Sequence, residues 1–465
     1  MTGRGRPRRR LAAAAMVGAI AGCAVDEGAE VAAYRDVLER GLDQDARAPS
    51  VHGPLTVVDT MRLVNARYEP LSIGGEDYLQ SLIEVRRAAA AFLPVVSLSP
   101  SYRWEENTGG DDSPAALDTA VGADIDLNPV ADMARVRQRR AAAGQTRALL
   151  LDLQDTVLLD AARAHYEVLR AERAVRVLES SLQLQRERVA DARGRLEVGV
   201  VRPLDASLVE SQAAQTAVDL IAAQNAVATG RSLLGFLTAE PLGGVELVDE
   251  LGAPAAAPGP LPELWALAEA RRQDVLAAEQ RIVGARRAVE SAYGEYFPRV
   301  SLGVQAFLQR DSEPTDLDIA GVISLSLPLF SAGLIEADVR TALSQLRQAK
   351  LDEALTRRAA RRDVEIAGDN LRYSAERESQ LRVQERVAQE ALNLAEAAFQ
   401  VGLGTNLERV EAQDRLLSTQ LQLVNAEFDR KIAHLDLLRT TGRLHELLGL
   451  ERASAGPATG AGEGG

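Results

Sequence analysis

Three acidic side chains lie near the start of two helices that the sequence predicts after glycine turns. Asp205 follows the turn at Gly199, and Glu408 and Glu411 follow the turn at Gly402. A carboxylate near a helix N-terminus accepts hydrogen bonds from free backbone N–H groups, and a threonine three residues before Glu408 completes a capping-box pattern. Helix capping is therefore one role for Asp205 and Glu408, and a further electrostatic role stays open.

The other residues that carry chemistry form no recognisable site. The histidines show no metal-ligand spacing to one another, and the sequence holds no phosphate loop, nucleophile elbow or zinc motif. Those histidines are His52, His165, His434 and His445. Cys23 is the only cysteine, which excludes disulfides and cysteine-based metal sites. We therefore predict that the protein is not an enzyme, with no catalytic residue, no metal and no cofactor.

The N-terminus resembles a bacterial lipoprotein signal. A basic segment over residues 1–10 precedes an apolar stretch of about twelve residues, which is too short to span a membrane. The stretch ends in Ile-Ala-Gly-Cys, which is similar to a lipobox, so Cys23 is the expected lipidation site. Ala24 follows it instead of an aspartate, which points to an outer-membrane anchor. The alternative is a plain signal peptide with an incidental cysteine.

Charge and composition narrow the class of protein further. The chain of 465 residues has a formal net charge of −14, and removing residues 1–22, with five arginines and no acid, makes it more acidic. Such a chain is a poor candidate for binding nucleic acid. Aromatic residues make up only 4%, which suits long helices better than one thick globular core.

The sequence repeats its landmarks at a spacing of about 200 residues. Each copy predicts a strand, a loop, a second strand, a very long helix, a glycine turn and a returning helix. The paired landmarks are Leu93-Pro94 with Phe297-Pro298, Asp126–Pro129 with Ser326–Leu329, and Glu197–Val200 with Gln400–Leu403.

Four segments alternate apolar and polar residues with the period of a strand. They cover residues 96–104, 121–127, 300–309 and 319–327, each long enough or nearly so to cross hydrocarbon when tilted. Polar loops at 105–118 and 310–317 join them in pairs. A soluble sheet with one buried face has the same period, and stays as the alternative. Four strands cannot close a barrel, so a membrane role requires several chains to pool their strands, and three copies would give twelve.

The predicted helices are too long for a globule. Two run over about 132–198 and 333–401, and each would form a rod of roughly 100 Å. Returning helices are expected near 203–238 and 405–448, and shorter ones near 60–92 and 262–294 precede the strand pairs. The segment 239–262 is rich in proline and glycine and predicts an irregular belt. Much of 24–55 and the tail after Arg452 have a disordered composition.

Taken together, the duplicated units, the lipobox and the two Val-Gly turns resemble the TolC-like outer-membrane efflux family. Residues 266–298 are similar to one helix of that family, with Gln273 where proline is common, and the resemblance covers about residues 57–448. It implies a mainly α fold with a small β part, built from duplicated helical hairpins and four membrane strands per chain. Three copies would form a 12-stranded barrel continued by a 12-helix periplasmic tunnel.

The resemblance also implies function and partners. Family members form the outer-membrane exit duct of tripartite efflux or type I secretion systems, and their helix turns dock a periplasmic adaptor, or membrane fusion protein, that connects to an inner-membrane pump. The other expected contacts are with outer-membrane lipid and two further copies of the chain. By position, the docking tips are Val198, Gly199, Val200, Val401, Gly402 and Leu403.

The same resemblance implies a role for the three acidic residues near the turns. Glu408 and Glu411 match acids that constrict the tunnel in the family, and Asp205 matches an acid of the closed-state latch. Gly404 stands where that latch has a basic residue, and Arg202 is near but not equivalent. Because carboxylates around a narrow pore concentrate cations, we expect the tunnel entrance to prefer cations.

Two other functions stay possible at this point: a periplasmic coiled-coil adaptor, and a structural lipoprotein without a channel. Neither function requires two duplicated hairpins and membrane-length strands, so neither accounts for these features of the sequence. The expected segments are a signal peptide (1–22), a lipidated linker (23–56), a first repeat (57–238), an equatorial linker (239–261), a second repeat (262–448) and a disordered tail (449–465).

Overall fold

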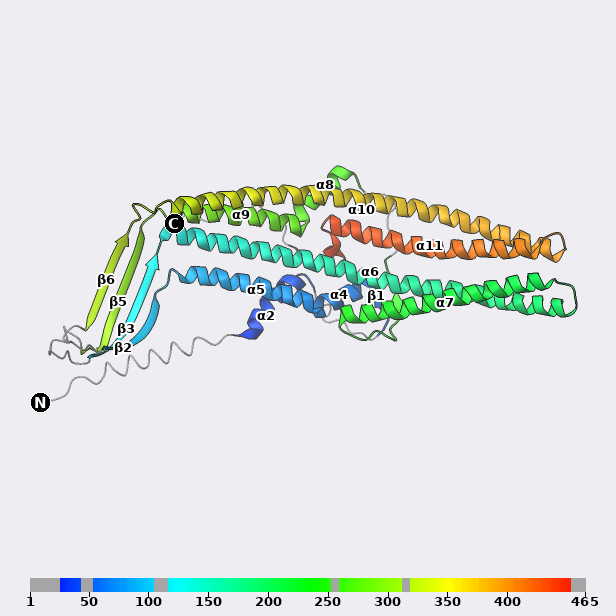
Figure 1. The fold of residues 1–465 in the computed structure, drawn as a ribbon, viewed down its shortest axis with the longest axis horizontal. Coiled ribbons are helices and arrows are strands. Elements are labelled where there is room, and N and C mark those ends of the chain that lie inside the picture. The colour runs from blue at the N-terminus through cyan, green and yellow to red at the C-terminus, as the bar shows by residue number, and fades with distance from the viewer. Residues whose placement is uncertain (1–25, 43–52, 104–115, 252–258, 312–317, 453–465) are drawn as a thin grey trace.

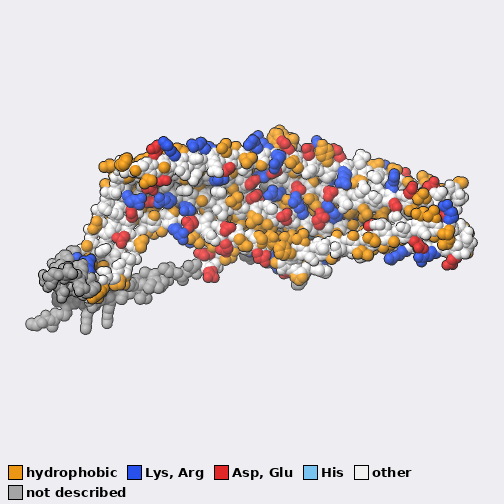
Figure 2. Space-filling model, viewed as in Figure 1, with side chains coloured by type: hydrophobic (Ala, Val, Ile, Leu, Met, Phe, Trp, Pro, Cys, Tyr) orange, Lys and Arg blue, Asp and Glu red, His pale blue; other side chains and the backbone are white. Residues whose placement is uncertain are grey.

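The computed structural model describes residues 26–42, 53–103, 116–251, 259–311 and 318–452. In these ranges the chain forms a long rod of helices with a small sheet at one end and two helix turns at the other (Figure 1). Charged side chains of both signs are spread along the helical part (Figure 2). Cys23, the expected signal peptide and the residues after Arg452 lie outside the described ranges.

The two long helices follow the repeat. Helix α6 spans Pro129–Glu197 and α10 spans Leu334–Gln400. Helix α6 begins where the Asn128 side chain accepts a hydrogen bond from the Ala131 N–H (3.1 Å), with proline at the first helical position. The returning helices are α7 (Pro203–Thr238) and α11 (Asn406–Thr440). Each long helix and its partner form one hairpin.

The expected helix over 405–448 ends early. Gly442 has φ of +68°, which closes α11 at Thr440, and a short 3-10 helix, η1 (Leu444–Leu448), follows. A Cβ atom at Gly442 would lie 2.8 Å from the backbone of Arg271, so a larger residue would not fit. Residues 449–452 are also ordered, contrary to the expected disorder of 449–465, because the buried Arg452 side chain pairs with Asp155.

Both shorter helices are broken, although one helix was expected over each of 60–92 and 262–294. The first consists of α4 (Val57–Arg67) and α5 (Glu69–Ala90), and the second of α8 (Leu261–Arg271) and α9 (Gln273–Gly294). One residue with an extended backbone separates the two helices of each pair: Tyr68 in the first pair and Arg272 in the second. A proline at the second position of α5 explains the first break. At the second break, Arg272 donates to Asp274 (2.7 and 3.0 Å) and Asp363 (3.3 Å).

The N-terminal linker contains a helix where irregular structure was expected. Helix α2 spans Glu27–Glu39 and buries Tyr34 and Leu38. The Tyr34 ring lies over Gly75 of α5, where any side chain would clash, and the Leu38 carbonyl accepts hydrogen bonds from Asn65 (3.4 Å) and Gln154 (2.7 Å). The segment therefore belongs to the folded core.

The largest apolar core lies at the middle of the rod. A short parallel pair, β1 (Leu55–Thr56) with β4 (Leu247–Val248), joins the expected belt to the first repeat. His165 is fully buried there: its Nδ1 atom lies 2.9 Å from the Thr60 hydroxyl and its Nε2 atom lies 3.3 Å from the Val248 carbonyl oxygen. Burial lowers the pKa of His165 to about 4, so the ring is neutral at pH 7.

Ion pairs join the two hairpins along the face that α6 shares with α11. Arg163 pairs with Asp436 (2.5 Å), Arg170 with Asp429 (2.7 Å) and Arg173 with Glu427 (2.9 Å). The first two pairs are one heptad apart on both antiparallel helices, so the same side of each helix faces its neighbour throughout. This ion-pair seam fixes the register of one hairpin against the other.

The sheet at the end of the rod has the strand order β2-β3-β5-β6, all antiparallel. The strands are β2 (Val95–Arg103), β3 (Ala116–Leu127), β5 (Arg299–Gln309) and β6 (Ile319–Ser326). Strand β3 begins at Ala116, so its first three residues lie inside the loop expected at 105–118. The outer strands, β2 and β6, leave both edges of the sheet open in the single chain.

We predict that acid weakens the fold through its buried histidines. Burial also lowers the pKa of His445 to about 4, so between pH 6.5 and pH 4 the unfolded chain binds protons that the folded chain does not. Each histidine then removes up to about 3 kcal/mol of stability as the pH falls. Thermal unfolding followed by circular dichroism should show a falling midpoint, and His165→Gln should remove part of this slope.

The control is Ser418→Ala, an exposed residue of α11 without a titratable side chain, which should keep the wild-type slope. Equal slopes for wild type and His165→Gln would contradict the assignment of a depressed pKa to His165.

Candidate functional site

The sheet presents one apolar and one polar face, in register across all four strands. The apolar rows across the strands contain Val96, Ala123, Val304 and Gly321; Leu98, Val121, Ala306 and Ile319; Ile125, Leu302 and Ile323; and Leu127, Val300 and Leu325. Several of these side chains are largely uncovered in the single chain: Ile323 is 77% exposed and Leu325 is 70% exposed. Such an area of exposed apolar surface indicates contact with lipid or protein.

The opposite face carries mostly polar and small residues, with two valines in one row. Its rows contain Ser97, Gly122, Gln305 and Ala320; Val95, Asp124, Gly303 and Val322; and Asp126, Ser301 and Ser324. The Asp124 carboxylate lies across β5 at Gly303, where a Cβ atom would be 2.9 Å from its Oδ1 atom. One face is thus suited to hydrocarbon and the other to water.

The far end of the rod consists of two turns of closely similar geometry. Gly199 and Gly402 both have φ of +75°, a conformation that glycine adopts without strain. The amide of each following residue bonds back to the helix end: Val200 to the Arg195 carbonyl and Leu403 to the Ala398 carbonyl, both at 2.9 Å.

These turns hold four aliphatic side chains out into solvent. Val198 is 73% exposed, Val200 72%, Val401 70% and Leu403 88%. Positions 198–200 and 401–403 therefore form two short apolar projections, at the places where the sequence predicts docking tips.

Glu408 takes part in a helix cap. Its carboxylate accepts a hydrogen bond from the Thr405 N–H (2.8 Å), and the Thr405 hydroxyl accepts one from the Glu408 N–H (3.2 Å). This is the capping box that the sequence predicts. Glu411 lies one turn further along α11, and both glutamates are exposed. Their spacing of three residues places both carboxylates on one side of the helix.

Asp205 has a different partner. The Arg202 guanidinium donates to both of its carboxylate oxygens, at 2.9 and 3.0 Å, and this bond lowers the pKa of Asp205. Both residues of this ion pair belong to the first hairpin, three positions apart, so Arg202 offsets the charge of Asp205 locally. Asp205 nevertheless touches the second hairpin, because its backbone carbonyl accepts a hydrogen bond from the Asn406 side chain (3.1 Å).

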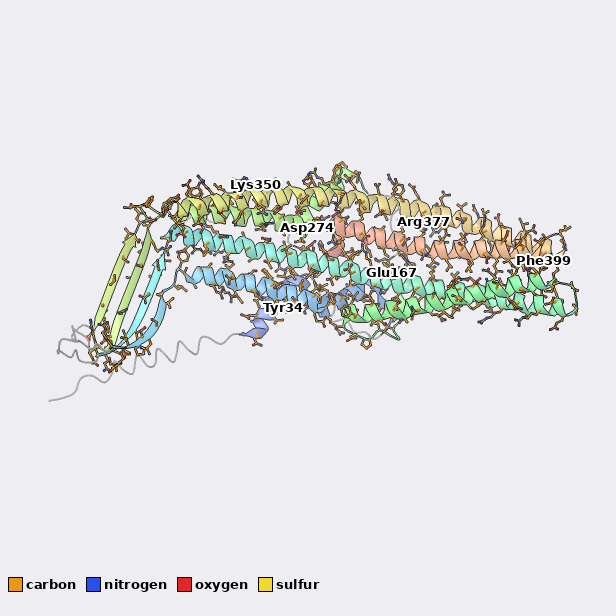
Figure 3. All side chains as sticks on the ribbon, in the orientation of Figure 1. Tyr34, Glu167, Asp274, Lys350, Arg377 and Phe399 are labelled. Atoms are coloured by element: carbon orange, nitrogen blue, oxygen red, sulfur yellow. The ribbon has the colours of Figure 1, made fainter. Side chains whose placement is uncertain are left out.

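The residues that join the two tips were not predicted from the sequence. Phe399, Asn406 and Arg409 form one cluster with Asp205, and Figure 3 places Phe399 near the end of α10 furthest from the sheet. Phe399 and Arg409 are ordinary helix residues in the sequence. Their shared position on one hairpin follows from the turn at Gly402, but contact with the other hairpin has no local signal.

Among the described residues, no group of three or more histidine, cysteine, aspartate or glutamate side chains has an arrangement that could hold a metal ion. None of the described helices combines the length and the apolar character needed to span a bilayer.

Comparisons with known proteins agree on one family. The model for the family described as "Outer membrane efflux protein" matches residues 264–443. The outer membrane efflux protein BepC of Brucella suis is 28% identical over 315 residues, which cover 66% of this chain and 67% of BepC. The outer membrane protein TolC of Escherichia coli is 22% identical over 398 residues, covering 81% of this chain and 80% of TolC.

Solved structures share the fold at low identity. A crystal structure of CusC matches with a TM-score of 0.76 and 18% identity, covering 87% of this chain and 97% of that chain. The outer membrane protein VceC of Vibrio cholerae matches with a TM-score of 0.74 and 19% identity, covering 83% and 96%.

We predict that the cap at Thr405 stabilises the start of α11. Thr405→Ala removes the hydroxyl acceptor and should cost about 1 kcal/mol locally, which speeds hydrogen exchange of the first-turn amides about fivefold. Hydrogen-exchange mass spectrometry of residues 405–410 measures this. Ser418→Ala, an exposed hydroxyl on the same helix, serves as the control. Equal exchange rates in Thr405→Ala and wild type would mean that the capping box contributes no stability to the start of α11.

Proposed function

Because the chain belongs to the TolC-like outer-membrane efflux protein family, we propose that it is the outer-membrane exit duct of a tripartite efflux or type I secretion system. It passes substrates that a pump and an adaptor deliver from the inner membrane to the exterior. It works as a conduit and not as an enzyme, and it uses no cofactor and no nucleic acid.

The observation that carries this proposal is the sheet with one apolar and one polar face and two open edges. Backbone N–H and C=O groups on a sheet edge cannot stay unpaired in hydrocarbon. Each chain supplies four strands, so three chains pool twelve, and β6 of one protomer then pairs with β2 of the next. The apolar face meets outer-membrane lipid, and the polar face lines the lumen of the barrel.

The helices continue the same assembly into the periplasm. Each chain contributes four helices at the tip end, from the hairpins α6–α7 and α10–α11, so a homotrimer has a 12-helix tunnel. The shorter helices extend α7 and α11 toward the sheet. Residues 57–238 and 262–448 act as the two repeats of each protomer, with the belt 239–261 at the equator.

The two tips are the surface for the periplasmic adaptor, through which the duct reaches the inner-membrane pump. The docking residues are Val198, Gly199, Val200, Val401, Gly402 and Leu403. This assignment is supported by the exposure of four aliphatic side chains on turns closed by backbone hydrogen bonds, since apolar projections of this kind pack into grooves of a partner. In the mature protein, a lipid on Cys23 anchors the opposite side of the assembly to the outer membrane.

Glu408, Glu411 and Asp205 are the acids of the tunnel constriction. Arg202 neutralises Asp205 locally, so Glu408 and Glu411 supply most of the negative field. With three copies of each around the axis, they attract cations and repel anions at the entrance. Asp205 acts mainly by placing its backbone carbonyl beside the second hairpin.

We predict that the double variant Glu408→Gln/Glu411→Gln loses cation preference. Glutamine keeps the acceptor that the capping box needs, so the substitution removes charge without removing the cap. In planar lipid bilayers, the cation-to-anion permeability ratio from reversal potentials in a salt gradient should fall about threefold or more, with the larger difference at low salt.

Glu263→Gln, an exposed acid at the start of α8 in the middle of the rod, is the matched control and should leave the ratio unchanged. A wild-type protein that forms no channels in the bilayer would contradict the proposed function. An unchanged ratio in the double variant would contradict only the role of the two glutamates.

A further inference from the structure

A small cavity between the two hairpin turns, which we call the tip cavity, has a lining with more positive than negative charge. Its volume is about 340 Å³, and it lies beside Val200 of the first turn and Gly402 of the second. Three of its charged lining residues are basic and two are acidic, which leaves a net charge of +1. These residues are Asp191, Arg195, Arg202, Asp205 and Arg409.

Four of these five residues form pairs with one another. Arg195 donates to the Asp191 carboxylate at 3.0 Å. Arg202 donates to both carboxylate oxygens of Asp205, at 2.9 and 3.0 Å. Both arginines are also exposed, so water solvates them as well. The excess positive charge of the tip cavity therefore belongs to Arg409.

Arg409 is a buried cation without an acidic partner among the residues that the structure describes. It is 7% exposed, and its Nε–H group has no hydrogen-bond acceptor. It contacts the Asn406 Oδ1 atom (2.9 Å) and the Phe399 ring, whose centroid lies 4.2 Å from the guanidinium carbon. The nearby Glu396 carboxylate is bound by Arg188 (3.0 Å). Burial, together with the charge of Arg188, lowers the pKa of Arg409.

A guanidinium in this position favours a negatively charged ligand. A buried charge without a counter-charge costs free energy, and a bound anion offsets that cost. The unpartnered Nε–H group of Arg409 can donate to one oxygen of a carboxylate while a neighbouring N–H group donates to the other. Asn406, the first residue of α11, also lines the cavity, and a helix N-terminus favours an anion. Glu408 and Glu411 do not line it.

We propose that the tip cavity is a binding site for one carboxylate, with Arg409 as its counter-charge. The carboxylate belongs either to a free organic acid or to an acidic side chain of another protein. The second source rests on the proposed function, because in an exit duct the protein that meets the tips is the adaptor. The binding site itself follows from the charge and burial of its lining residues and does not depend on conduction.

The test is hydrogen-exchange mass spectrometry of the full-length protein in detergent at pH 7, in 100 mM sodium acetate and in 100 mM sodium chloride. Acetate is the probe because it carries the carboxylate of an acidic side chain and little else. Amides of residues 399–410 should exchange about fivefold more slowly in acetate, which corresponds to a Kd of roughly 25 mM. Residues 57–67 of α4, in the middle of the rod, should exchange equally in both salts.

Two variants should move the acetate effect in opposite directions. Arg409→Met removes the buried cation, keeps an unbranched side chain and should abolish the difference between the two salts. Asp205→Asn leaves Arg202 without its acid, which makes the cavity more positive and should increase the protection by acetate to about tenfold. Arg415→Gln removes an exposed arginine six residues further along α11, and as the matched control it should keep the wild-type effect. Circular dichroism shows whether each variant is folded.

A hexaglutamate peptide with blocked ends, added at about 1 mM, separates the two sources of the carboxylate. Protection by the peptide assigns the site to a carboxylate on a protein chain, and protection by acetate alone assigns it to a free organic acid. The site would be overturned by equal exchange in both salts together with no protection by the peptide, or by a folded Arg409→Met protein that keeps the acetate effect. A wild-type protein that forms no channel in planar bilayers would instead overturn the proposed function and leave the site standing.

Discussion

Backbone groups at the edge of a sheet need hydrogen-bond partners, and hydrocarbon provides none. The four-stranded sheet of this chain has two such edges and a face of exposed aliphatic side chains, and in the proposed assembly further copies of the chain complete it. That requirement extends to the rest of the molecule. In that proposed assembly the rod of helices follows the same symmetry as the sheet, which accounts for α6 and α10 being longer than a single globular core needs.

The duplication supplies two copies of one unit, and the structure shows how they have diverged. The turns at Gly199 and Gly402 keep the same backbone geometry, yet the acids beside them have different surroundings. Asp205 is neutralised by Arg202, whereas Glu408 caps its helix and stays exposed with Glu411. The first hairpin therefore provides a backbone acceptor at the tip, and the second provides the negative charge and the side chains that reach across.

The parts of the fold with a local periodic signal were predictable from the sequence. Alternation placed all four strands, and the Thr405–Glu408 spacing gave the cap at the start of α11. The errors have tertiary causes. The break at Arg272 depends on Asp363, 91 residues away, and the end of α11 depends on close packing of Gly442 against Arg271. Helix α2 was missed because only two of its side chains, Tyr34 and Leu38, are buried. The contact between Asn406 and the Asp205 carbonyl was missed because it joins residues of different hairpins, 201 positions apart in the sequence.

The most direct measurement of the central claim is imaging of the full-length protein extracted from membranes in mild detergent. We expect a three-fold symmetric particle on the order of 130 Å long, from the rise of a helix of nearly seventy residues plus a tilted strand, with a detergent belt around the sheet end. A single-chain rod, a two-fold particle, or a particle without detergent at the sheet end would contradict it.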